Sequence, residues 1–117
     1  MKLRSFLTIF LLLAVECHAQ SCMTIQGRAR FYSGDGQLRI WHIGTHHEFA
    51  IYDDTSSDML FKYLCSPKYA CTLENPPKSL YANFKVCPTE QFKQGAAQPA
   101  TLKSIERAVV VPWKQDN

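Results

Sequence analysis

Residues 23–43 read MTIQGRARFYSGDGQLRIWHI, and this stretch decides the fold. In residues 23–32 apolar or small side chains alternate with polar ones, which is the period of a strand with one buried face. Residues 33–36, SGDG, tolerate the positive φ angles of a tight turn. Residues 37–43 are again rich in β-branched and aromatic side chains. The stretch therefore predicts a β-hairpin.

Three further strands are predicted downstream of the hairpin. Gly44 predicts a bend, after which residues 46–52 continue as the third strand. Residues 80–87 alternate as the first strand does, and residues 101–111 are β-branched enough to close the sheet. Residues 89–100, between the last two strands, are polar and rich in Gly and Ala, so they predict a long connecting loop.

One helix is predicted between the third and fourth strands. Apolar side chains recur at helical spacing within residues 57–65, Ser57 is a candidate N-cap, and Pro67 lies just beyond the end. Three strands, a helix and two more strands is the element order of the OB-fold, a five-stranded Greek-key barrel. We therefore predict a mostly β, OB-like five-stranded small barrel with one short helix. An open α+β sheet is the alternative.

Residues 1–19 have the composition of a signal peptide. Lys2 and Arg4 precede an apolar run at residues 6–15, which is too short to span a bilayer because a spanning helix needs about 20 residues. Small side chains favour cleavage after Ala19. The sequence therefore predicts export, to a periplasm or out of the cell, of a single domain formed by residues 20–117. No later stretch predicts a membrane span.

Four cysteines remain after this cleavage, and an even number in a small exported chain predicts two disulfides. Three pairings are possible. We favour Cys65 with Cys71, which are close in sequence, and Cys22 with Cys87, which ties the start of the first strand to the end of a later one. A zinc site is the less favoured alternative, because no two cysteines have the spacing of a zinc knuckle.

The composition argues against several classes of protein. An apolar fraction of 46% and a charged fraction of 20% are typical of a globular domain. Residues 20–117 hold 11 of the 13 basic and 9 of the 10 acidic side chains, and the basic ones are dispersed along the chain. A protein that tracks nucleic-acid phosphates usually has a clustered basic stripe. Nucleic acid is therefore not an expected partner.

No catalytic motif is found in the sequence. It has no nucleophile elbow, no dinucleotide-binding glycine pattern and no phosphate-binding loop. Asp53 and Asp54 are adjacent and point in different directions in an extended chain, so they suit a turn better than a shared proton. We expect neither enzyme activity nor a cofactor.

Potential metal ligands gather in residues 42–48. His42, His46 and Glu48 have side chains that suit zinc, copper or nickel. On a regular strand His42 and His46 lie about 13 Å apart, so one ion could be shared only if the chain bends at Gly44. A periplasmic transition-metal-binding protein is therefore the alternative function, and histidines that face solvent or form hydrogen bonds are the favoured interpretation.

Aromatic side chains suggest a recognition surface. Trp41, Phe49, Tyr52 and Tyr81 could form a stacking platform, although most aromatic side chains are needed to fill a small barrel. In an OB-fold the second and third strands and the loops after the first and fourth strands form the usual ligand face. We therefore predict a non-catalytic binding module for a small molecule, glycan or protein. Its surface is bordered by Arg39, Trp41, His46 and Phe92.

Two motifs carry a resemblance to a known family. Residues 39–49, RIWHIGTHHEF, and residues 84–89, FKVCPT, resemble a family of small exported bacterial proteins of uncharacterised function. The resemblance runs from about Cys22 to Trp113. It implies a small exported β-rich domain and no catalytic activity.

Overall fold

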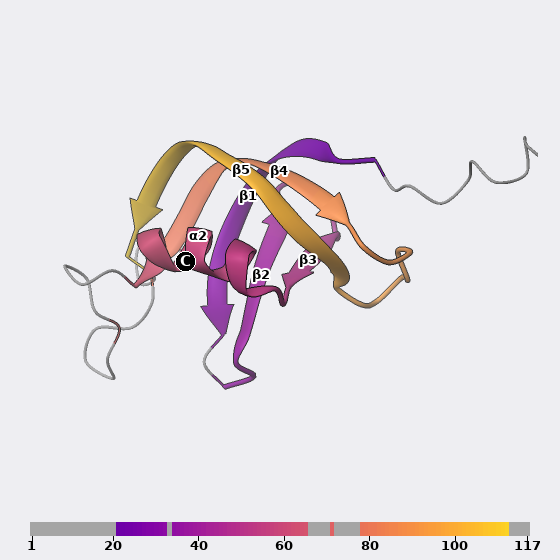
Figure 1. Ribbon diagram of the computed structural model, residues 1–117, viewed down its shortest axis with the longest axis horizontal. Coiled ribbons are helices and arrows are strands. Elements are labelled where there is room, and N and C mark those ends of the chain that lie inside the picture. Colours follow the sequence, from indigo (N-terminus) through magenta and orange to yellow (C-terminus); the bar gives the residue numbers. More distant parts are fainter. Residues whose placement is uncertain (1–20, 33, 66–70, 72–77, 113–117) are drawn as a thin grey trace, which may run out of the picture.

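The computed structural model describes residues 21–32, 34–65, 71 and 78–112 (Figure 1). The predicted signal peptide, residues 1–19, and Pro67 after the predicted helix lie outside the described residues. The described elements are β1 (Met23–Tyr32), β2 (Gln37–His42), β3 (Glu48–Ile51), α2 (Asp54–Leu64), β4 (Ser79–Pro88) and β5 (Gln98–Val111).

The five strands close into a barrel in the order β1-β2-β3-β5-β4, with β4 pairing back to β1. β3 and β5 run parallel, and every other neighbouring pair is antiparallel. This order, with α2 between β3 and β4, confirms the predicted OB-like barrel, and the open sheet is wrong. β5 begins at Gln98 rather than at residue 101, because residues 98–100 pair with β3.

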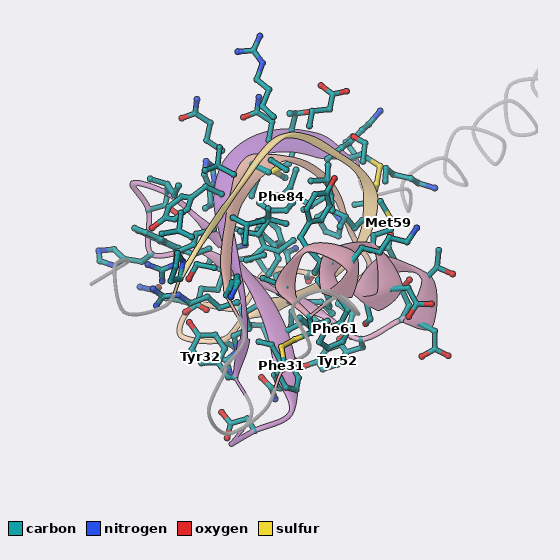
Figure 2. All side chains as sticks on the ribbon, turned by 90° about the vertical axis from the view of Figure 1, so that its left-hand side faces the viewer. Phe31, Tyr32, Tyr52, Met59, Phe61 and Phe84 are labelled. Carbon is teal, nitrogen blue, oxygen red and sulfur yellow. A yellow bond between two sulfur atoms is a disulfide. The ribbon has the colours of Figure 1, made fainter. Side chains whose placement is uncertain are left out.

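The core is the inside of the barrel. Alternate side chains of β1 point inward, as their period predicts, and Phe49 and Phe84 are fully buried at its centre. Figure 2 shows Phe84 within the ring of strands and Phe61 of α2 near Phe31 of β1. The ring centroids of Phe31 and Phe61 are 5.3 Å apart. Gly27 also faces inward, and a Cβ at this position would lie 2.9 Å from side-chain atoms of Ile40 and Phe84.

Helix α2 begins earlier than predicted. The N-cap is Asp53, whose Oδ2 accepts a hydrogen bond from the backbone N–H of Ser56 at 3.0 Å, so the expected cap at Ser57 is wrong. Leu60 and Leu64 are buried against the barrel. Ser56 is also buried, and its Oγ accepts a hydrogen bond from the backbone N–H of Leu102 in β5 at 2.8 Å. This contact fastens the first turn of the helix to the barrel.

We expect the Ser56→Ala substitution to lower the free energy of unfolding by about 1–3 kcal/mol, because the buried N–H of Leu102 then loses its acceptor. Chemical denaturation measures this loss. The matched control is Ser57→Ala in the same turn, at a residue that is less buried than Ser56. Equal effects of the two substitutions would contradict the proposed role of the Ser56 hydroxyl.

Both predicted disulfides are present. Cys22 is bonded to Cys87 across 65 residues of sequence, and Cys65 is bonded to Cys71 across 6. The first bond joins the chain just before β1 to the end of β4. Two disulfides fit an oxidising compartment such as those reached by export. Within the part of the chain that the structure describes, none of the helices has the length and apolar character needed to cross a membrane.

Candidate binding face

A row of four side chains crosses the outer face of the barrel. Strand register places Tyr81 of β4 opposite Arg28 of β1, Arg28 opposite Trp41 of β2, and Trp41 opposite Glu48 of β3. These residues alternate with the core positions, so their side chains share the outer face. The guanidinium carbon of Arg28 lies 4.8 Å from the ring centroid of Trp41, which is a cation–π distance.

A second arginine–aromatic pair lies on the same hairpin. The guanidinium carbon of Arg39 in β2 lies 5.7 Å from the ring centroid of Tyr32 in β1. Nε and Nη2 of Arg39 both donate to Oε1 of Gln37, at 3.0 and 2.7 Å, and Nη1 lies 3.9 Å from Oε2 of Glu48. The side chains of Arg39 and Glu48 remain 33% and 38% exposed. The guanidinium of Arg39 is therefore held in place and still open to solvent.

The β2–β3 turn fixes the indole of Trp41. Its Nε1–H donates to the backbone carbonyl of Thr45 at 2.8 Å. The hydroxyl of Thr45 in turn donates to the carbonyl of His42 at 2.7 Å and accepts from the backbone N–H of His47 at 3.0 Å. These bonds, with Gly44 at a φ of 86°, fold residues 42–47 into a tight turn. Trp41 is a half-buried aromatic side chain in a fixed orientation.

The loop after β4 is fastened to the same turn. The Phe92 ring lies 4.4 Å from the His47 ring, which stacks at 4.4 Å on Phe49. Nε2 of His47 is 2.9 Å from Oε1 of the buried Gln98, and the amide nitrogen of Gln98 donates to the carbonyl of Glu90 at 2.8 Å. The Gln98 amide therefore joins the turn to the loop. Because its nitrogen is used by Glu90, its oxygen accepts from an Nε2–H of His47.

The structure brings three of the four predicted surface residues to one end of β2. Trp41 and His46 belong to this end, and Phe92, which is 50% exposed, reaches it through His47. Arg39 lies two residues before Trp41 on the same face. Residues 34–36, which come just before β2, lie at its other end.

The aromatic platform that was the alternative to core packing does not form as a unit. Phe49 is fully buried, so it belongs to the rings that fill the barrel, which is the favoured interpretation of these aromatic side chains. Tyr52 is 63% exposed but follows the end of β3, outside the cross-strand row. Of the four aromatic side chains considered, only Trp41 and Tyr81 share the row. A recognition surface here therefore combines arginines with single aromatic rings.

The three candidate metal ligands, His42, His46 and Glu48, do not lie together on one face of the sheet. Trp41 and Glu48 are register partners on the outer face, so His42, the next residue in β2, points to the opposite face. His46 is exposed in the turn between them. Among residues 21–32, 34–65, 71 and 78–112, no group of three or more His, Cys, Asp or Glu side chains is arranged to hold an ion.

The sequence analysis did not predict that Arg28 and Tyr32 contribute to the candidate binding face. Alternation alone places both on the polar side of the first strand, but their pairing with Trp41 and Arg39 depends on the β1–β2 register. The turn length sets that register. If the hairpin register is set with Tyr32 opposite Gln37, Arg28 falls opposite Trp41 and Tyr32 falls near Arg39, so both arginine–aromatic pairs follow.

Comparison with known proteins gave no match to a family model, a curated protein or a solved structure. The resemblance of residues 39–49 to a family of exported proteins stays a prediction. The geometry of the face is therefore the basis for proposing a function.

Proposed function

We propose that the protein is an exported, non-catalytic binding module whose ligand face is the outer surface of β1, β2 and β3, and that its ligand is anionic. The observation that carries the proposal is the guanidinium of Arg39, which Gln37 holds in place and which stays 33% exposed on the same face as Trp41. Arg30, the register partner of Arg39, is buried, and its Nε donates to Oγ of Ser79 at 2.8 Å. An anionic group can therefore pair with Arg39 from the solvent side of the sheet.

The chemistry of the face favours an oligosaccharide that carries carboxylates. Guanidinium groups pair with carboxylates in a bidentate manner, and Arg39 is already oriented by Gln37. Trp41 offers a flat apolar surface for a sugar ring, and the carboxylate of Glu48 beside it can accept hydrogen bonds from sugar hydroxyl groups. OB-folds use this part of the barrel for oligosaccharides and oligonucleotides. The predicted export, which the two disulfides fit, favours the oligosaccharide.

We expect Arg39→Ala to weaken binding of a galacturonate hexamer by about tenfold or more, because a charge-assisted bidentate bond is lost. Isothermal titration calorimetry measures this change. Lys103→Ala, which removes an exposed cation from β5, is the matched control and should leave the affinity unchanged. A neutral maltose-type hexamer should bind more weakly than the galacturonate hexamer, and added salt should weaken only the charged ligand.

Two results would contradict the proposal. One is equal affinity of the wild type, Arg39→Ala and Lys103→Ala for the galacturonate hexamer, and the other is absence of binding by the wild type. Binding of a glutamate hexapeptide without binding of the galacturonate hexamer would contradict the oligosaccharide and indicate an acidic peptide as the ligand. Trp41→Phe tests the aromatic contribution, and thermal unfolding of each variant verifies that the fold is retained.

A further inference from the structure

A pocket lies on the outer face of the barrel between Tyr81 and the turn at the end of β2, and Ile43 of that turn belongs to its lining. Its volume is about 280 Å³, and it is lined by residues of β1, β4 and β5 together with Ile43 after β2. Gly27 and Ala82, which are register partners, lie in the middle of the lining, and Gln26 and Asn83 form the next register pair. Because Gln26 and Asn83 alternate with core positions, their amide groups belong to the outer face.

A β-bulge brings Arg107 to this pocket. In the β4–β5 ladder Tyr81 pairs with Val109 and Asn83 pairs with Glu106, so two residues of β5, Arg107 and Ala108, oppose the single residue between them. Arg107 has a φ of 55°, and it is the only described residue other than glycine with a positive φ. Glycine is the residue that adopts this conformation without strain. An arginine here keeps a cation at the pocket at a cost in backbone strain.

The lining has the chemistry of a small anion site. Arg107 supplies a cation, Gln26 and Asn83 supply amide donors, and none of the lining residues is acidic. Among the described residues, Glu106 included, no carboxylate forms an ion pair with Arg107. Ile43 and Val109 add exposed apolar surface, at 38% and 59% exposure. The volume lies at the lower end of the range of small-molecule sites, so a polymer is a poor fit.

We propose that this pocket binds a small aliphatic carboxylate. The carboxylate pairs with the guanidinium of Arg107 and accepts hydrogen bonds from the amides of Gln26 and Asn83, and the aliphatic body packs on Val109 and Ile43. Residues with strained backbone conformations cluster at ligand sites, and the positive φ of Arg107 is such a conformation. The pocket shares Tyr81 with the cross-strand row, but Arg39 and Trp41, on which the oligosaccharide proposal rests, do not line it.

An NMR titration of the whole exported protein with isovalerate tests the proposal. We expect saturable shifts of the backbone amide of Arg107 and of the side-chain amides of Gln26 and Asn83. Arg107→Asn should weaken binding by about tenfold, because asparagine tolerates a positive φ but lacks the guanidinium. Arg107→Gly should lose binding and also raise the melting temperature, since glycine relieves the strain. Lys103→Asn, on the same strand, is the matched control and should retain the wild-type affinity.

The uncharged analogue isovaleramide distinguishes a site that recognises a carboxylate from a shallow apolar depression that binds any aliphatic group. We expect it to cause little or no saturable shift at Gln26 and Asn83. Equal binding of isovaleramide and isovalerate would overturn the proposal, as would wild-type affinity in Arg107→Asn or no saturable shift in the wild type. A lower melting temperature in Arg107→Gly would overturn the account of the strained arginine. None of these results depends on whether the oligosaccharide face binds its ligand.

Discussion

Replacing Cys22 and Cys87 together with alanine is expected to lower the free energy of unfolding by about 4 kcal/mol. The disulfide between them closes a loop across 65 residues, so its loss frees most of the unfolded chain. In the chain-entropy account the stabilisation grows with the logarithm of loop length. Domains of this size are stable by about 5–15 kcal/mol, so this single bond is a large share of the total. Guanidinium denaturation of the oxidised proteins measures the change.

The second disulfide provides the control for this prediction. Cys65 and Cys71 are only 6 positions apart in the sequence, and their replacement by alanine is expected to lower the free energy of unfolding by about 2 kcal/mol. A larger loss from the short loop than from the long one would contradict the account. Titration of thiols in the unfolded wild type should find no free thiol among the four bonded cysteines.

The substitution Gly27→Val is expected to lower the free energy of unfolding by about 3 kcal/mol, through overpacking of the core. A Cβ at Gly27 would already lie 2.9 Å from Cγ2 of Ile40 and from Cδ2 of Phe84, and both of these side chains are fully buried. Interiors are close-packed, so neither neighbour has space to move away. Thermal and chemical unfolding measure the loss.

Gly34→Ala is the matched control for Gly27→Val. A Cβ at Gly34 meets nothing within 4 Å, and its φ is not positive, so this substitution should change stability little. If Gly27→Val were as mild as Gly34→Ala, the close approach of β1, β2 and β4 at Gly27 would be wrong.

The first strand could be predicted to the residue, whereas the helix and the third strand could not. Alternation runs unbroken through β1, so its bounds follow from the period alone. Residues 53–57 contain several side chains able to cap a helix, and packing selected Asp53 because Ser56 then reaches the N–H of Leu102. β3 begins at Glu48 rather than at residue 46, because the hydroxyl of Thr45 bonds both sides of the turn.

The candidate face could be predicted only in part for a similar reason. Arg39 and Trp41 follow from the OB-like order of elements and the period of β2. The cation–π partners of these two residues depend on register, and the contact of Phe92 with His47 depends on how a loop lies across a turn. The left-handed conformation of Arg107 arises from a bulge between two long strands, and local sequence has no glycine there to predict it.

The most direct test of the binding function is an NMR map of the wild-type protein titrated with the galacturonate hexamer. The account predicts saturable shifts of the Trp41 indole N–H, now bonded to the carbonyl of Thr45, and of the Arg28 and Arg39 amides, with little change on the helix α2. Shifts confined to α2 or to β5, or no saturable shift on β1 and β2, would contradict it.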